Sequence, residues 1–277
     1  MNPVRKALWF IESHFAGEIS LDDIASVGGV SRFHMSRAFP ILTGRSVTAY
    51  VRGRRLTQAA RALANGAPDI LAVALEAGYG SHEAFTRAFR DQFGVTPESI
   101  RAQGHLNDVN LVEPILMDDR LIENLEPPRF EKSKPLLIGG MGERYSSCES
   151  AAGIPAQWQR FLPHLGKVPG QVGRTAYGVV CNTDDAANFD YLCGVEVSDF
   201  SRLPKDWGRV RIPEQKYAVF AHRGHLSTIR DTLASIWSKW LPESGHEAAD
   251  APTFERYGAE FDSNTGNGGL EVWIPIK

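Results

Sequence analysis

Cysteine is scarce in this chain of 277 residues, which contains Cys148, Cys181 and Cys193. A small, odd number of cysteines excludes the disulfide framework of a small secreted protein, and their spacing matches no set of metal ligands. We therefore expect buried free thiols in a reducing compartment. The sequence predicts no metal site and no cofactor.

Long apolar runs are also missing. No stretch approaches the roughly 20 apolar residues that cross a bilayer. Glu12 and His14 interrupt the region in which a signal peptide would carry its apolar segment. These absences predict a soluble, cytoplasmic protein without a membrane partner.

Lysine is nearly absent from residues 1–105, where all but Lys6 of the 12 basic residues are arginine. This part also has 9 acidic residues and a formal net charge of +3, whereas residues 106–277 have 18 basic and 24 acidic residues, net −6. Arginine makes fork-shaped contacts with phosphate and guanine. The asymmetry predicts two domains with different partners.

A repeat dominates the basic part. Residues 31–39 read SRFHMSRAF and residues 81–89 read SHEAFTRAF, each after a short amphipathic stretch and a glycine-containing turn. Helix, turn and helix in this order is typical of a helix-turn-helix. Residues 46–64 are predicted to form one joining helix of roughly 27 Å. That length approaches the ~34 Å between successive major-groove faces of B-DNA, so one chain would read two adjacent groove segments.

Helical periodicity assigns roles within the two copies. Met35 and Phe39, like Phe85 and Phe89, are one turn apart and are expected to face the domain core. The outward side near each helix start is the end that meets base edges, while Arg90 would serve a phosphate. The alternative is a pair of amphipathic surface helices with solvated arginines, which the repetition disfavours. The residues expected to contact DNA are Arg32, Phe33, Ser36, Arg37, Ser81, His82, Glu83, Thr86, Arg87 and Arg90.

Residues 3–103 resemble the DNA-binding domain of the AraC/XylS family of transcription regulators. The resemblance rests on LDDIASVGGVSRFHMSRAF and on GYGSHEAFTRAF followed by FGVTP. It implies an all-α domain of two helix-turn-helix units that binds double-stranded promoter DNA, with RNA polymerase as a further partner. Pro40 departs from the family pattern, because it replaces a basic residue and is expected to kink its helix.

The acidic part reads as alternating strands interrupted by two helices, near 148–165 and 225–241. The order is two strands, a helix and two strands, written twice, which predicts a duplicated β-β-α-β-β domain of the α+β class. We place the DNA-binding domain at 1–105, a linker at 106–125 and the second domain at 126–277.

Residues 126–277 resemble the GyrI-like effector-binding domain in the phrases YAVFAHRG, WLPESG, FERYGAEF and EVWIPI. The resemblance implies two pseudo-symmetric halves around a cleft that binds small, often lipophilic or cationic, molecules through aromatic walls and a carboxylate. Alternation along the strand places Glu255 and Tyr257 on one face. The alternative is that Glu255 forms a surface salt bridge while the aromatic residues pack the core. The residues expected to bind the effector are Glu255, Tyr257, Tyr177, Trp207, Phe220 and Trp273.

Together these features predict a DNA-binding transcriptional regulator that responds to a small molecule. Two alternatives are a GyrI-like hydrolase in which Glu255 acts as general base, and a DNA-binding protein that sequesters toxins. The sequence shows no nucleophile–His–Asp arrangement and no metal cluster, so we expect a protein that is not an enzyme.

Overall fold

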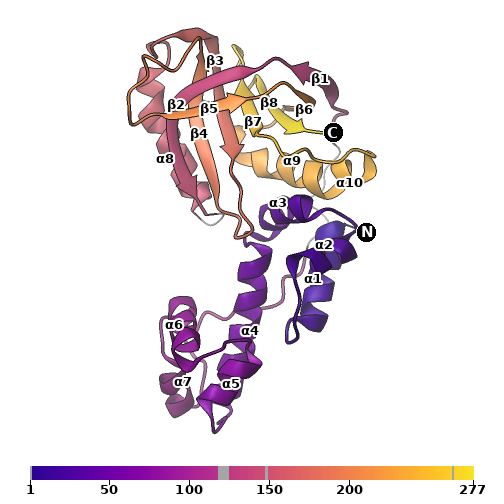
Figure 1. Ribbon diagram of the computed structural model, residues 1–277, viewed down its shortest axis with the longest axis vertical. Helices are drawn as coiled ribbons and strands as arrows, with labels where there is room; N and C mark the ends of the chain where they lie inside the picture. Colours follow the sequence, from indigo (N-terminus) through magenta and orange to yellow (C-terminus); the bar gives the residue numbers. More distant parts are fainter. Residues whose placement is uncertain (1, 118–124, 147–148, 264) are drawn as a thin grey trace.

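The computed structural model describes residues 2–117, 125–146, 149–263 and 265–277, in two domains stacked along the long axis (Figure 1). The N-terminal domain is helical. Its elements are α1 (Pro3–His14), α2 (Leu21–Gly28), α3 (Arg32–Thr43), α4 (Val47–Ala64), α5 (Ile70–Glu76), α6 (His82–Phe93) and α7 (Pro97–Gln103).

Local capping explains where the two repeated helices begin and end. Ser31 caps α3 and Ser81 caps α6, each by accepting a hydrogen bond from a backbone N–H three residues on. Gly44 and Gly94 end them with a φ of 73° in both cases, a left-handed conformation that favours glycine. Pro40 lies inside α3, and the helix continues beyond it to Thr43.

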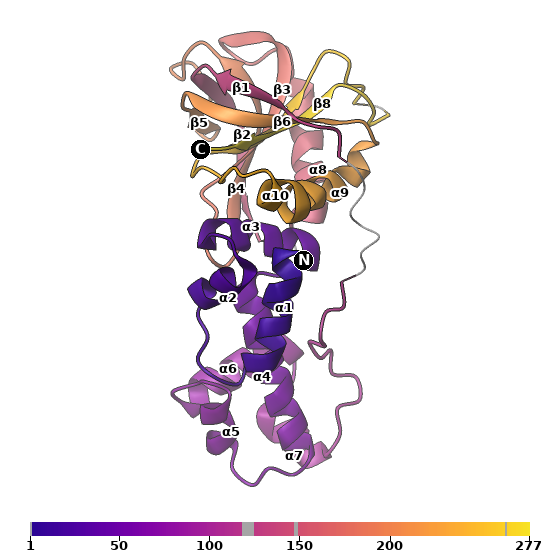
Figure 2. The ribbon, with the colours of Figure 1, turned by 90° about the vertical axis from the view of Figure 1, so that its right-hand side faces the viewer.

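The helices of the N-terminal domain form two groups along α4, with α1, α2 and α3 toward one end and α5, α6 and α7 toward the other (Figure 2). Met35 and Phe39 of α3 are fully buried with residues of α1 and α2. Phe85 and Phe89 of α6 are fully buried against α4 and α5. The 18 residues of α4 join the two cores and span about 27 Å at the usual helical rise.

The described start of the predicted linker packs along α4. The Val112 side chain is buried, and its backbone N–H donates to the Thr57 hydroxyl at 2.9 Å. Arg54 donates to the Val112 carbonyl at 2.7 Å while it also pairs with Glu12 at 2.8 Å. Residues 118–124 of that linker lie outside the described residues.

The C-terminal domain is built on an antiparallel sheet with the strand order β1-β6-β8-β7-β3-β4-β2-β5. Along the chain the elements follow the duplicated order that the sequence predicts. They are β1 (Arg129–Ser133), β2 (Leu136–Tyr145), α8 (Ser150–Phe161), β3 (Gln171–Cys181), β4 (Phe189–Val197), β5 (Gly208–Ile212), β6 (Gln215–His222), α9 (Ile229–Ser235), the π-helical turn η4 (Ile236–Trp240), α10 (Leu241–Glu243), β7 (Thr253–Tyr257) and β8 (Leu270–Pro275), with short 3₁₀ turns η2 (Leu162–His164) and η3 (Leu226–Thr228).

The helices of the two halves lie on the same face of this sheet (Figure 1). α8 packs on β2 and β4, where Phe161 is fully buried. The helical segment from α9 to α10 packs over β6 and β8 through Ile236, Phe220 and Val272. Strands β7 and β3 are adjacent in the middle of the sheet, so the seam between the helices runs over them.

Two further findings concern the described residues alone. None of their helices combines the length and the hydrophobicity of a membrane span, and none of their His, Cys, Asp and Glu side chains form a cluster that could hold a metal ion. Cys193 is a buried free thiol, as expected, whereas Cys181 is a half-buried one; Cys148 lies outside the described residues.

Candidate functional site

The second recognition helix, α6, presents polar side chains to solvent. Glu83, Arg87 and Arg90 are exposed on the side opposite Phe85 and Phe89. Arg87 also lines a shallow hollow together with Arg52 of α4 and Asp91 of α6. The two arginines suit a phosphate next to a base edge.

Three further predicted contacts lie at the start of α6. The Ser81 hydroxyl accepts the Ala84 N–H at 3.2 Å and serves as the helix cap. His82 Nε2 lies 3.2 Å from Glu98 Oε1 of α7. The Thr86 hydroxyl oxygen is buried and has no hydrogen-bond partner among the described residues.

The first recognition helix, α3, is in a different environment. Arg32 pairs with Asp22 at 2.7 Å and with Asp185 of the C-terminal domain at 2.5 Å. The Arg37 guanidinium stacks over the Phe33 ring at 3.6 Å from the ring centroid. Ser36 is only 8% exposed, and its hydroxyl donates to the Phe33 carbonyl at 3.0 Å. The four predicted DNA contacts of α3 are therefore engaged within the protein.

Glu255 is the centre of the candidate effector site. It lies on β7, beside Gly178 of β3 and Val272 of β8 in the strand register, at the seam between the two groups of helices. Its Oε2 atom accepts a hydrogen bond from the Tyr257 hydroxyl at 2.7 Å and another from the Tyr191 hydroxyl at 3.0 Å.

Aromatic and apolar side chains surround this carboxylate. The Trp158 indole N–H of α8 donates to the Tyr191 hydroxyl at 3.0 Å, and its ring lies 4.9 Å from that of Tyr257, centroid to centroid. Ile229 of α9 and Leu226 of η3 pack in the same cluster around Tyr257. Residues of both helical groups thus meet at Glu255.

Gly178 makes room for the carboxylate and the tyrosine. A Cβ atom at this position would lie 2.1 Å from the Tyr191 hydroxyl oxygen and 2.7 Å from Glu255 Oε2. Both distances are too short for any side chain. The glycine in the middle of β3 is therefore required by the site.

Burial raises the pKa of Glu255, while the hydrogen bonds from Tyr257 and Tyr191 oppose that rise. Burial also raises the pKa of Tyr191 and of Tyr257 well above the ordinary value for tyrosine. Both phenols therefore remain protonated and donate to the carboxylate. No Lys or Arg among the described residues forms an ion pair with Glu255.

This raised pKa predicts the pH dependence of stability of the Glu255→Gln variant. Consider a carboxyl whose pKa is higher in the folded chain than in the unfolded chain. Its contribution to stability is fully present at a pH below its pKa in the unfolded chain, and it is lost as pH rises through its pKa in the folded chain. We expect the melting temperature of the variant, relative to wild type, to increase from pH 4 to pH 8. Thermal melts across that range check this, with Glu260→Gln, at an exposed carboxylate, as control. A difference that does not vary with pH would contradict the raised pKa.

The other predicted effector residues lie elsewhere. Tyr177 and Trp273 are buried on the opposite face of the sheet, where the rings of both pack near Phe254. Trp207 contacts Phe161 under α8, and the Phe220 ring lies 4.8 Å from that of Trp240. Of the six residues, the structure brings together Glu255 and Tyr257.

Three residues of the site escape the sequence prediction, namely Tyr191, Trp158 and Gly178. Alternation in FDYLCGVEV places Tyr191 on the same face of its strand as Cys193, but it does not give the register of β4 relative to β7. That register passes through β3, in which Gly178 is aligned with Glu255 on one side and with Cys193 on the other.

Comparison with known proteins agrees with both architectures. Residues 126–277 match the model of the GyrI-like small molecule binding domain. The chain belongs to this GyrI-like family. Residues 24–103 match the model of a helix-turn-helix domain, so the chain joins a helix-turn-helix domain to a GyrI-like domain.

Two curated relatives match along almost the whole chain, and a third matches about half of it. The chain is 26% identical to the transcriptional regulator Rob of Salmonella typhimurium strain LT2, and the match covers 99% of this chain and 98% of Rob. It is 25% identical to the right origin-binding protein of Escherichia coli K12 over the same shares. It is 30% identical to the transcriptional regulator BrlR of Pseudomonas aeruginosa over 49% of this chain and 51% of BrlR. The GyrI-like chain described here is a DNA-binding transcriptional regulator with a small-molecule-binding domain.

Proposed function

We propose that the regulator binds a lipophilic cation at Glu255 and reads promoter DNA through α6 and α3. The observation that carries the ligand class is a desolvated carboxylate beside aromatic rings, without a protein cation to pair with it. A positive charge is stabilised there by the carboxylate and by the faces of Trp158 and Tyr257. An anionic ligand would meet an uncompensated negative charge.

The same proposal assigns the DNA contacts. Arg87, with Glu83 and Thr86 beside it, would read bases from α6, whereas Arg90 and Arg52 would contact phosphates. Residues 1–105 form the DNA-binding unit in this proposal, 106–125 the linker and 126–277 the effector unit. A regulator bound at a promoter acts on RNA polymerase, which is the further partner that we propose.

Binding without turnover is part of this proposal. Glu255 has a raised pKa, which a general base in a hydrolase would also need, so a hydrolytic role is the second candidate. Both tyrosine hydroxyls donate to the same carboxylate oxygen of Glu255, Oε2, and hold the side chain in place. Relatives are transcriptional regulators, which favours binding.

Two measurements on the full-length chain test the proposed function. Selection of duplexes from a random library should return an enriched motif, and calorimetry should show that tetraphenylphosphonium binds more tightly than neutral triphenylphosphine oxide. Equal binding of the two compounds would contradict the cation site. The absence of any enriched duplex at low salt would contradict the DNA-binding assignment.

A further inference from the structure

The two recognition helices repeat one sequence pattern, so the exposure of each residue of α3 can be compared with that of the equivalent residue of α6. At a separation of 50 residues, Phe33 corresponds to Glu83, Arg37 to Arg87 and Pro40 to Arg90. The three residues of α6 are exposed, whereas Pro40 is buried and Phe33 and Arg37 are half-buried. The face of α3 that corresponds to the exposed face of α6 is therefore covered.

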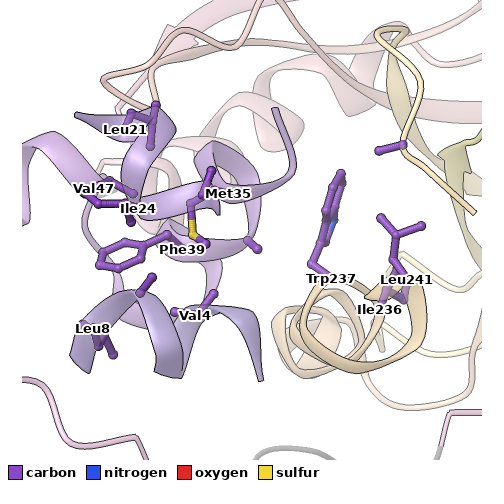
Figure 3. Packing of buried hydrophobic residues seen from close by; sticks show 14 of the residues in the cluster. Val4, Leu8, Leu21, Ile24, Met35, Phe39, Val47, Ile236, Trp237 and Leu241 are labelled. Atoms are coloured by element: carbon purple, nitrogen blue, oxygen red, sulfur yellow. The ribbon is translucent and has the colours of Figure 1, made fainter. Parts of the chain in front are cut away.

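The covering element is the helical segment α9–η4 of the C-terminal domain, which contacts α3 directly. The His34 ring N–H donates to the Trp237 carbonyl at 2.7 Å, and the two rings meet edge to face at 5.4 Å. Trp237 is 2% exposed and belongs to one apolar cluster with Met35 of α3 and Leu241 of α10. Figure 3 shows Trp237 between the helices of the two domains.

Charged side chains also contribute to the contact between α3 and the C-terminal domain. Asp185, in the loop between β3 and β4, forms the ion pair with Arg32. Burial lowers the pKa of Arg37 to about 10, and the negative charge of Asp250, just before β7, opposes that change. Two acidic side chains of the C-terminal domain thus stand near the two arginines that α3 would offer to DNA.

The sequence of α3 is adapted to this contact. α3 has the apolar residues Phe33 and Pro40 at the positions where α6 has the charged residues Glu83 and Arg90. Apolar side chains gain from burial against a protein surface and contribute little to a phosphate backbone. Phe33 packs against the apolar cluster that joins α3 to the C-terminal domain.

We propose that the C-terminal domain and duplex DNA compete for the same face of α3. When the domains are docked, the chain reads DNA with α6 alone; when they separate, both helices are available and the site lengthens by one groove segment. This inference rests on the proposed DNA-binding function. It adds that the docked C-terminal domain blocks α3 from DNA, and we call this blocking contact the mask.

The mask connects to the effector site through one continuous helical segment. Ile229, at the start of α9, packs in the cluster around Tyr257, and Trp237 follows eight residues later, about two turns along the helix. The π-helical turn at η4 lies at the interface end, and such turns are frequent at functional sites. A ligand that displaces Ile229 would shift Trp237 against α3.

Charge reversal on the C-terminal side tests this competition without changing any residue that we assign to DNA contact. In the full-length double variant Asp185→Arg/Asp250→Arg, the new arginines repel Arg32 and Arg37, which weakens the docking of the two domains. The control Asp206→Arg/Glu214→Arg has the same change in net charge, at exposed positions on either side of β5, an edge strand of the sheet. Duplexes are selected from a random library by wild type and by each variant, and dissociation constants are measured at one salt concentration.

The wild type and the control should select a motif that covers one groove segment. The Asp185→Arg/Asp250→Arg variant should select a motif longer by about 10 base pairs and bind it about tenfold more tightly than the control does. Equal motif lengths and equal affinities in the two variants would overturn the mask while leaving the proposed function in place. Failure of every protein to bind duplex DNA would overturn the proposed function itself.

Hydrogen exchange gives a readout that needs no DNA. Peptides covering α3 should exchange faster in the Asp185→Arg/Asp250→Arg variant than in the control, because loss of docking exposes that helix. Peptides covering α6 should exchange alike in both proteins. Equal exchange at α3 would overturn the inference.

Discussion

Glutamine at position 255 should weaken tetraphenylphosphonium binding by about 30-fold or more, because the variant removes the half-buried negative charge that faces the cation. The shape of the site should be retained, since the amide oxygen of the substituted side chain can still accept from Tyr257 and Tyr191. Calorimetry on the full-length Glu255→Gln variant measures the loss. Triphenylphosphine oxide, which has no charge, should bind wild type and variant alike.

Glu260→Gln is the matched control for this result. It removes the same formal charge from an exposed position just after β7, so it should leave tetraphenylphosphonium binding within about twofold of wild type. Equal losses in the two variants would show that the net charge of the domain attracts the cation and that Glu255 has no special part in it.

Alanine at position 87 should reduce affinity for the selected duplex by about 1–3 kcal/mol, roughly 10- to 100-fold, and relax base preference at one position. Arg87 is exposed on α6 and is free of the domain contact that covers Arg37. Electrophoretic shift or fluorescence anisotropy with the selected duplex and its single-base variants measures both effects.

Arg174→Ala is the control for Arg87→Ala, because Arg174 is an exposed arginine of the C-terminal domain. Its loss should leave DNA affinity close to the wild-type value. An Arg87→Ala protein that retains the same motif with the same base preferences would remove α6 from the reading role.

Local sequence was sufficient for most of the fold. Serine caps, glycine ends and apolar spacing each depend on a few neighbouring residues, and the helices around Ser31 and Ser81 form as those signals predict. The duplicated order of strands and helices in the C-terminal domain follows for the same reason. Glu255 and Tyr257 are two residues apart on one strand, so their meeting was predictable from alternation alone.

What could not be predicted depends on contacts between distant segments. Tyr191 reaches Glu255 only through the registers of β4 with β3 and of β3 with β7. The sequence predicts Tyr177 and Trp273 at the effector site, but both are buried on the other face of the sheet, because an aromatic ring fits a core as readily as a pocket. In the sequence, the apolar residues Phe33 and Pro40 are the signs that this face of α3 is covered. The local sequence does not show that the C-terminal domain is the part that covers it.

One linkage measurement tests the central claim that effector binding and DNA reading are coupled through the domain contact. The dissociation constant of the full-length wild type for the longer duplex, selected by the Asp185→Arg/Asp250→Arg variant, is measured with and without saturating tetraphenylphosphonium. We expect DNA binding to be about tenfold tighter with the cation, cation binding to be tighter by the same factor when DNA is present, and both effects to be lost in Glu255→Gln. Simultaneous binding of both ligands with unchanged constants would contradict it.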